Sequence, residues 1–216
     1  MTKRSFAWFG MAILAIGVAA YANTLLFAPD LRPPFARVLF TERPVAVFLH
    51  FMGGSIALVV GAFQLHAGLR ARFLGAHRWL GRVYVIAIIA GGGAGFYMAW
   101  YSFGGAVAQL GFGLLAVCWV GSTLNAWRHV RQRNLGEHRN WMIRSYALTL
   151  AAVTLRLYLP PSQIAGISMA VAYPIIAWLC WVPNLLIAEW FVRSQRGFAR
   201  LPDRSFKTAI GPTASM

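Results

Sequence analysis

The chain contains 216 residues, of which 59% are hydrophobic and only 12% are charged. Soluble domains carry about 25% charged residues, so this composition excludes an ordinary water-soluble fold. The net charge of +15 does not indicate a nucleic-acid partner, because the basic residues gather in short segments between long apolar runs, as they do in membrane proteins. The two cysteines, Cys118 and Cys180, lie within apolar runs, so a disulfide framework is not expected.

Six apolar segments are long enough to cross a bilayer, which takes about 20 residues of α-helix. The predicted spans cover residues 6–27, 45–66, 79–101, 106–127, 141–159 and 164–192. Pro174 and Pro183 predict a kink in the sixth span. We therefore expect an all-α polytopic membrane protein with a single transmembrane domain over residues 1–192. The basic tail at 193–216 is expected to be disordered.

The distribution of Lys and Arg predicts the orientation of these spans. With the N-terminus inside, sixteen of the 20 basic residues fall on the cytoplasmic side, and only Arg32, Arg37, Arg43 and Arg156 lie outside or near the outer face. Cytoplasmic loops are enriched in Lys and Arg, so both termini are predicted to be cytoplasmic. Ala20-Tyr21-Ala22 resembles a signal-peptidase site, but the apolar stretch is long for a signal peptide, so we expect the first span to be retained.

Small and polar residues recur at steps of three and four in spans two to five, which predicts the face that each helix turns toward its neighbours. In the second and third spans this face holds His50, Gly54, Ala57, Gly61, Gln64, His77, Gly81, Tyr84, Ile88, Gly91, Gly95 and Met98. In the fourth and fifth spans it holds Gly111, Leu115, Cys118, Ser122, Asn125, His129, His138, Met142, Ser145, Thr149, Ala152 and Arg156. We expect spans two to five to form a core four-helix bundle, with spans one and six at its periphery.

Two segments share the order His-Arg, Trp, Arg, Tyr, and each opens a span: 77–84 and 138–146. Either a duplication or the same requirement at the membrane interface explains the repeat. Together with His50, the Gly-Ala-Phe-Gln sequence at 61–64 and Arg156, they resemble the bacterial membrane-protein family named domain of unknown function 2306, over about residues 45–160. That family usually has Pro where Ala62 stands. The resemblance implies a multi-pass protein of the bacterial inner membrane without an established activity.

The histidines suggest a specific hypothesis, which is binding of b-type haem for electron transfer. Haem iron accepts imidazoles from facing helices, and a four-helix membrane bundle provides the cavity. If spans three and five lie on a diagonal, His77 and His138 face each other at the cytoplasmic end, with His129 as a substitute ligand. Arg82 and Arg144 are then candidates for pairing with the haem propionates.

Three alternatives remain open. His77 and His138 are equally well explained as interfacial residues of a structural, assembly or lipid-binding membrane protein. They are also candidate ligands of a transition metal, although no Cys or carboxylate on the same faces supports such a site. A small transporter with a polar site at His50 and Arg156 is the third, because an intramembrane Arg is costly and needs a partner. Gln64 and Asn125 are further polar residues inside the predicted spans. Membrane lipids, a second copy of the chain or a respiratory-chain protein are the expected partners.

Overall fold

A computed structural model describes residues 3–32 and 34–198, and within these ranges every regular element is helical. The helices are α1 (Lys3–Phe27), the short 3-10 helix η1 (Pro29–Leu31), α2 (Pro34–Glu42), α3 (Pro44–Gln64), α4 (Ala67–Arg72), α5 (Leu74–Ala99), α6 (Gly105–Arg131), α7 (Leu135–Thr149), α8 (Ala151–Ile164), α9 (Met169–Leu179) and α10 (Val182–Phe198). The all-α polytopic fold predicted from the sequence is confirmed. The end of the predicted disordered tail, at 199–216, lies outside the described residues.

Five helical segments of the described chain are long and apolar enough to cross a membrane: Ser5–Phe27, Pro44–Gln64, Leu74–Ala99, Gly105–Arg131 and Met169–Gln195. Their outward side chains include large apolar groups such as Ile86 and Ile187, exposed by 67% and 65%, which is the surface expected to face lipid. These segments overlap five of the six predicted spans, but some bounds differ: the third segment starts at Leu74 rather than at residue 79, and the last covers 169–195 rather than 164–192.

The remaining predicted span, at 141–159, is divided into α7 and α8 by Leu150. Leu150 keeps nearly helical angles (φ −67°, ψ −8°), so the two helices form one bent segment rather than two separate elements. The last span is also divided, because α9 ends at Leu179 and α10 starts just before Pro183. A proline ring clashes with the carbonyl four residues earlier, which for Pro183 is that of Leu179. The predicted kink is therefore located at Cys180.

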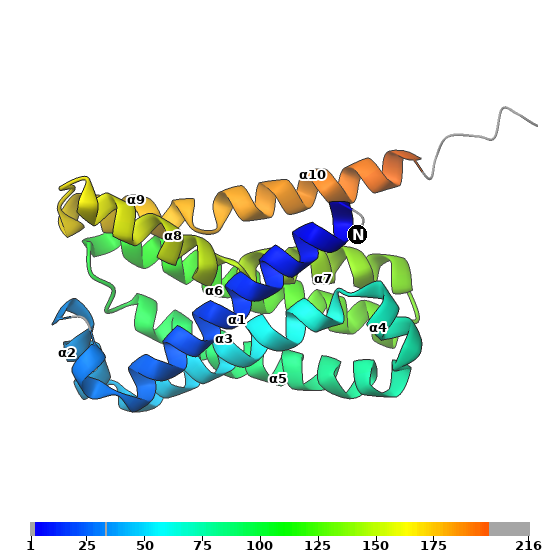
Figure 1. The fold of residues 1–216 in the computed structure, drawn as a ribbon, viewed down its shortest axis with the longest axis horizontal. Helices are drawn as coiled ribbons and strands as arrows, with labels where there is room; N and C mark the ends of the chain where they lie inside the picture. Colours follow the sequence, from blue (N-terminus) through cyan, green and yellow to red (C-terminus); the bar gives the residue numbers. More distant parts are fainter. Residues whose placement is uncertain (1–2, 33, 199–216) are drawn as a thin grey trace, which may run out of the picture.

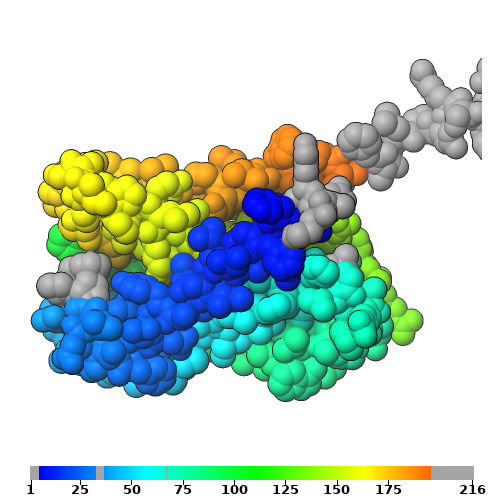
Figure 2. Space-filling view, viewed as in Figure 1, coloured from blue at the N-terminus to red at the C-terminus, as the bar shows by residue number. Residues whose placement is uncertain are grey.

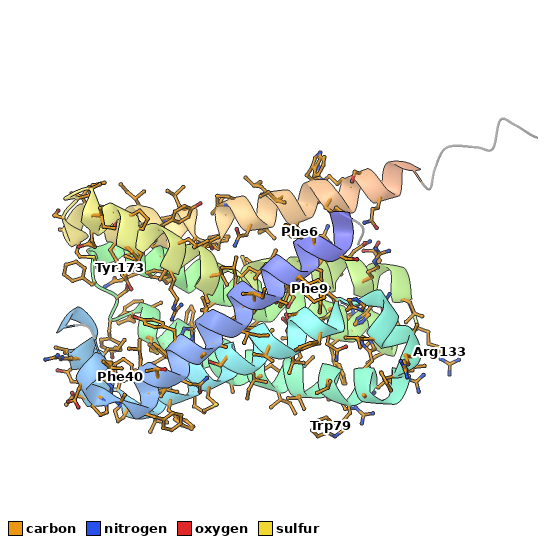
Figure 3. All side chains as sticks on the ribbon, in the orientation of Figure 1. Phe6, Phe9, Phe40, Trp79, Arg133 and Tyr173 are labelled. Carbon is orange, nitrogen blue, oxygen red and sulfur yellow. The ribbon has the colours of Figure 1, made fainter. Side chains whose placement is uncertain are left out.

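Helices α3, α5, α6 and α7 form a four-membered ring in which each packs against the next, and α3 and α7 close it. This arrangement confirms the predicted core bundle and puts α5 and α7 on a diagonal. Helix α1 crosses α3 obliquely and covers it (Figures 1 and 2). Helix α9 packs on both α6 and α8, whereas α10 packs on α7. Helices α2 and α4 lie at opposite ends of the bundle (Figure 1), and Figure 3 shows Phe40 and Tyr173 at the α2 end and Trp79 and Arg133 at the α4 end.

Glycines bring α3 and α5 into close contact. A Cβ atom on Gly53 would lie 2.5 Å from the carbonyl oxygen of Ala87 and 2.9 Å from the Cα atom of Gly91, so only glycine fits there. The sequence pattern placed Gly54 on this face, but a Cβ on Gly54 would meet nothing within 4 Å. The prediction for Gly54 was therefore off by one position. Membrane helices gain from such approaches because lipid provides no hydrophobic drive for association.

Candidate functional site

Three polar layers follow one another along the bundle. On α5 the three layers lie at the levels of His77, Tyr84 and Gly91, which are seven residues apart. Seven residues correspond to about 10.5 Å along the helix, and they return to almost the same side of it. We call them the histidine layer (His77, His129, His138), the hydroxyl layer (Tyr84, Trp119, Thr123, Ser145, Thr149) and the arginine layer (His50, Arg156). The histidine layer lies at the α4 end of the bundle, because His77 is in the first turn of α5, directly after α4.

The hydroxyl layer joins α5, α6 and α7 at the centre of the bundle. The Tyr84 hydroxyl oxygen lies 2.9 Å from Ser145 Oγ, which lies 2.7 Å from Thr123 Oγ1. Thr123 donates its proton to the Trp119 carbonyl, so Ser145 donates to Thr123 and Tyr84 donates to Ser145. The Trp119 indole donates to Thr149 Oγ1 at 2.8 Å, and Thr149 donates to the Ser145 carbonyl. Every donor in this buried set has an acceptor, as a low-dielectric interior demands.

Tyr146 connects this layer to α3. Its hydroxyl donates to the Leu58 carbonyl at 3.1 Å, and its ring is 2% exposed. Gly61 makes room for two tyrosine rings at once, because a Cβ there would lie 2.4 Å from Tyr146 Cε2 and 2.9 Å from Tyr84 Cε2. The predicted inward positions of Gly61, Tyr84, Ser145 and Thr149 are thus confirmed, and the axis between α5 and α7 is filled at this level.

The histidine layer contains the three histidines predicted for the cytoplasmic end. His138 Nδ1 lies 2.9 Å from the Ala126 carbonyl on α6, so this ring nitrogen is held by the backbone. The Nδ1 atoms of His77 and His129 are buried and have no hydrogen-bond partner among the described residues. His77 and His138 each precede the hydrogen-bonded Tyr84 and Ser145 by seven residues, so they lie at the same level of α5 and α7. Gln64 of α3 closes this end by donating to the His77 carbonyl at 2.8 Å.

The two candidate arginines differ in their surroundings. Arg144 is only 12% exposed, and its Nη2 atom lies 2.6 Å from Glu189 Oε2 on α10, with Nε donating to the same oxygen. Glu189 also accepts from Arg193 at 2.7 Å. Arg144 is therefore engaged with α10 and is not free for a propionate. Arg82 is exposed on α5, one turn beyond the first turn of that helix.

The predicted face of α6 needs a correction. Trp119, Thr123 and Ala126 point into the bundle, whereas Asn125 and Cys118 line a groove toward α10. The amide of Asn125 donates to the carbonyl of Gly121, four residues earlier on its own helix. The pattern of small and polar residues on α6 thus marked the contact with the last span, which the sequence had placed at the periphery.

The arginine layer lies two turns from the hydroxyl layer, on the side away from the histidines. His50 sits against the glycines of α5: its Nδ1 lies 2.9 Å from the Gly91 carbonyl, and a Cβ on Gly95 would come within 2.7 Å of that same nitrogen. Arg156 lies within electrostatic range of His50 and over the Tyr21 ring, 5.5 Å from its centroid. Its Nη1 donates to the carbonyl of Ala152, but its buried Nε has no partner among the described residues.

No carboxylate compensates Arg156 in the described part of the chain, where the ion pairs both involve Glu189. The same residues also contain no cluster of three or more His, Cys, Asp or Glu side chains that could hold a metal ion.

A family model described as "Predicted membrane protein (DUF2306)" matches residues 47–192, more than half of the chain. The chain belongs to this family. The match runs from α3 into α10 and contains all three polar layers, so it extends well past the segment that carried the resemblance in the sequence. No curated protein and no solved structure matches the chain significantly. The protein is thus a multi-pass membrane protein of the DUF2306 family, whose description names no activity.

Proposed function

We propose that this protein binds haem b between His77 and His138 and transfers electrons in the bacterial cytoplasmic membrane. The supporting observation is that His77 of α5 and His138 of α7 lie at the same level of two diagonal helices, at one end of the bundle. The Ala126 carbonyl orients His138 through Nδ1, and the buried Nδ1 of His77 has no hydrogen-bond partner among the described residues. Anchoring Nδ1 to a carbonyl is the usual way to present Nε2 to a metal.

Helix geometry supports the level and direction of the two rings. Tyr84 and Ser145 are hydrogen-bonded across the diagonal, and His77 and His138 each precede them by seven residues. Seven residues are about two turns, so both histidines face the same gap, about 10.5 Å nearer the end of the bundle. Since the hydroxyl layer fills the axis above, the macrocycle would have to lie at the end of the bundle.

The surroundings favour this end for a flat group. A Cβ on Gly81 would meet only the Gln64 amide, at 3.9 Å, so little side-chain volume covers that position. In contrast, the space beside Gly91 is filled by the backbone of α3, and the space beside Gly95 is filled by the His50 ring, so neither position leaves room for a macrocycle. Arg82 would pair with a propionate, and His129, with its own unpartnered Nδ1, would replace either ligand. Bound haem would supply a one-electron couple for exchange with a respiratory-chain partner.

The same proposal places both termini in the cytoplasm. Sixteen of the 20 Lys and Arg residues belong to segments on that side when the described helices are laid across a bilayer in chain order. The histidine layer then faces the cytoplasm and the arginine layer faces the outside. Reporter fusions to Met216 and to the α2 segment would test this orientation, and an outward C-terminus would refute it.

The absorbance spectrum of the full chain, purified in detergent from cells supplied with a haem precursor, tests the haem proposal. We expect a Soret band that disappears in His77→Ala and in His138→Ala. His66→Ala is the matched control, because His66 caps α4 at the same end but accepts its hydrogen bond from Leu69 and packs on Trp8. Absence of a Soret band after haem supplementation would refute the function, and its retention in both variants would refute the ligands.

A second candidate function rests on the uncompensated charge of Arg156. An Arg inside a membrane bundle normally pairs with a charge or a polar ligand, so we infer that the arginine layer would bind an anionic solute for transport. His50, whose Nδ1 lies against the Gly91 carbonyl, is within electrostatic range of Arg156. Uptake of labelled organic anions by proteoliposomes, with Arg156→Gln as the comparison, tests this alternative. Equal rates in the wild type, the variant and empty liposomes would exclude it.

A further inference from the structure

A groove runs along the membrane-facing side of the bundle between α6, α7 and α10, where α10 lies beside α7 (Figure 1). Its volume is about 410 Å³, within the range of about 300–1,000 Å³ that is typical of small-ligand sites. The walls are formed by Cys118, Gly121, Ser122, Asn125, Trp141, Arg144, Leu148, Leu185, Leu186 and Glu189. Neither proposed function uses this groove.

The groove is apolar at one end and charged at the other. Cys118, Leu148 and Leu185 lie toward the bundle centre. Of the polar wall residues, Ser122 donates its hydroxyl proton to the Trp119 carbonyl and Asn125 donates one amide proton to the Gly121 carbonyl. The end that contains Cys118, Leu148 and Leu185 therefore offers mainly apolar contact, which suits an acyl chain better than a quinone ring with two carbonyl oxygens.

Two exposed arginines continue the walls toward the α4 end of the bundle. Arg128 follows Gly121 by seven residues on α6, and Arg193 follows Leu186 by seven residues on α10, so each extends the same helix face by two turns. Arg193 is 76% exposed and contacts Glu189, which also neutralises Arg144. One carboxylate among three arginines leaves a net positive charge at the mouth of an apolar groove.

We propose that the groove binds one anionic phospholipid. Its acyl chain lies between α6 and α10 against Gly121 and Leu185, and its phosphate pairs with Arg128 and Arg193. Charge complementarity supports this occupant: the mouth is net positive, and the groove behind it is lined largely with apolar side chains. In the proposed orientation the mouth meets the cytoplasmic leaflet, where anionic lipids attract basic residues. The proposal does not depend on haem or on transport, because it involves a different face of the bundle.

The test measures lipid retention by the full chain in a mild detergent, using native mass spectrometry. Phosphatidylglycerol is titrated in parallel with phosphatidylcholine that has the same acyl chains. We expect the wild type to retain one phosphatidylglycerol and to lose it at least about tenfold more readily when Arg128→Gln and Arg193→Gln are combined. Arg70→Gln with Arg72→Gln, an equal change of charge on α4, is the control and should retain the lipid.

A second variant tests the groove itself. A Cβ on Gly121 would meet nothing within 4 Å, so Gly121→Leu fills the groove without a clash in the helix and should also abolish retention. Wild-type retention of phosphatidylglycerol by either the double arginine variant or Gly121→Leu would overturn the proposal. Co-purification of an isoprenoid quinone that Gly121→Leu removes, with phosphatidylglycerol unaffected, would overturn it as well. Circular dichroism of each variant confirms that the helices have formed.

Discussion

The close approach of α3 and α5 gives a sharp prediction for Gly53→Ala. The new methyl group would lie 2.5 Å from the Ala87 carbonyl oxygen and 2.9 Å from Gly91 Cα, and both of these are backbone atoms that cannot rotate away. The two helices must therefore separate. Separation also stretches the 2.9 Å contact between His50 Nδ1 and the Gly91 carbonyl, which joins the same pair of helices.

The expected loss of stability is about 2 kcal/mol. Overpacking of a well-packed interior costs about 1–3 kcal/mol. A hydrogen bond between membrane helices adds about 0.6 kcal/mol when it is weakened. Replacing Gly by Ala inside a helix stabilises the helix by about 1 kcal/mol or less. The steric cost is therefore larger than the gain in helix propensity.

Thermal unfolding in mild detergent, followed by circular dichroism, measures the change. For about 200 residues, a loss of about 2 kcal/mol corresponds to a lower Tm of about 4–8 °C. Gly54→Ala is the matched control, because its Cβ would meet nothing within 4 Å and only helix propensity changes. It should leave the Tm equal or raised. A Gly53→Ala variant as stable as Gly54→Ala would refute the packing of α3 on α5.

Two further predictions concern buried polar contacts. Tyr84→Phe removes the donor to Ser145 and should lower stability by about 0.6 kcal/mol and no more than about 1.7, since Ser145 keeps its bond to Thr123. Arg144→Gln leaves Glu189 without its least exposed partner and should cost about 2 kcal/mol, well above the cost of Arg193→Gln at the exposed partner. Both are measured by the same unfolding experiment.

Each of these has its own control. Tyr158→Phe changes an exposed tyrosine and should leave the Tm unchanged. For the ion pair, Glu189→Gln added to Arg144→Gln should recover part of the loss, because it removes a carboxylate that has lost its less exposed partner and keeps only the exposed Arg193. A loss above about 2 kcal/mol for Tyr84→Phe would contradict the redundant bonding of Ser145. Equal losses for Arg144→Gln and Arg193→Gln would contradict the difference in burial.

The predicted faces of α5 and α7 were correct because each of these helices turns one side toward the bundle. His77, Gly81, Tyr84 and Ile88 follow one another at steps of three and four on α5. The structure buries Tyr84 and Ile88 completely. Ser145 and Thr149 follow the same rule on the bent segment. Small and polar residues at a helical repeat identify a contact face reliably when a helix has one such face.

Helix α6 shows where this reasoning fails. It packs against α5, α7 and α9, so a pattern of small residues cannot say which neighbour each position meets. Trp119 is not among the predicted inward positions, yet its indole donates to Thr149 inside the bundle. The Arg144–Glu189 ion pair could not be predicted from the sequence either, because its partners are 45 residues apart and meet only when α10 packs on α7.

The hydroxyl layer also bears on the choice between the two candidate functions. A solute that moves along the bundle axis must pass Tyr84, Thr123 and Thr149, which are at most 3% exposed and whose hydroxyls are bonded to one another or to the backbone. Opening that path breaks several buried bonds at once and separates α5 from α7. An electron needs no such opening, because the layer leaves the histidine end accessible while it holds α5 and α7 in place. A closed centre with imidazoles at one end is therefore better suited to redox exchange at that end than to transport through the axis.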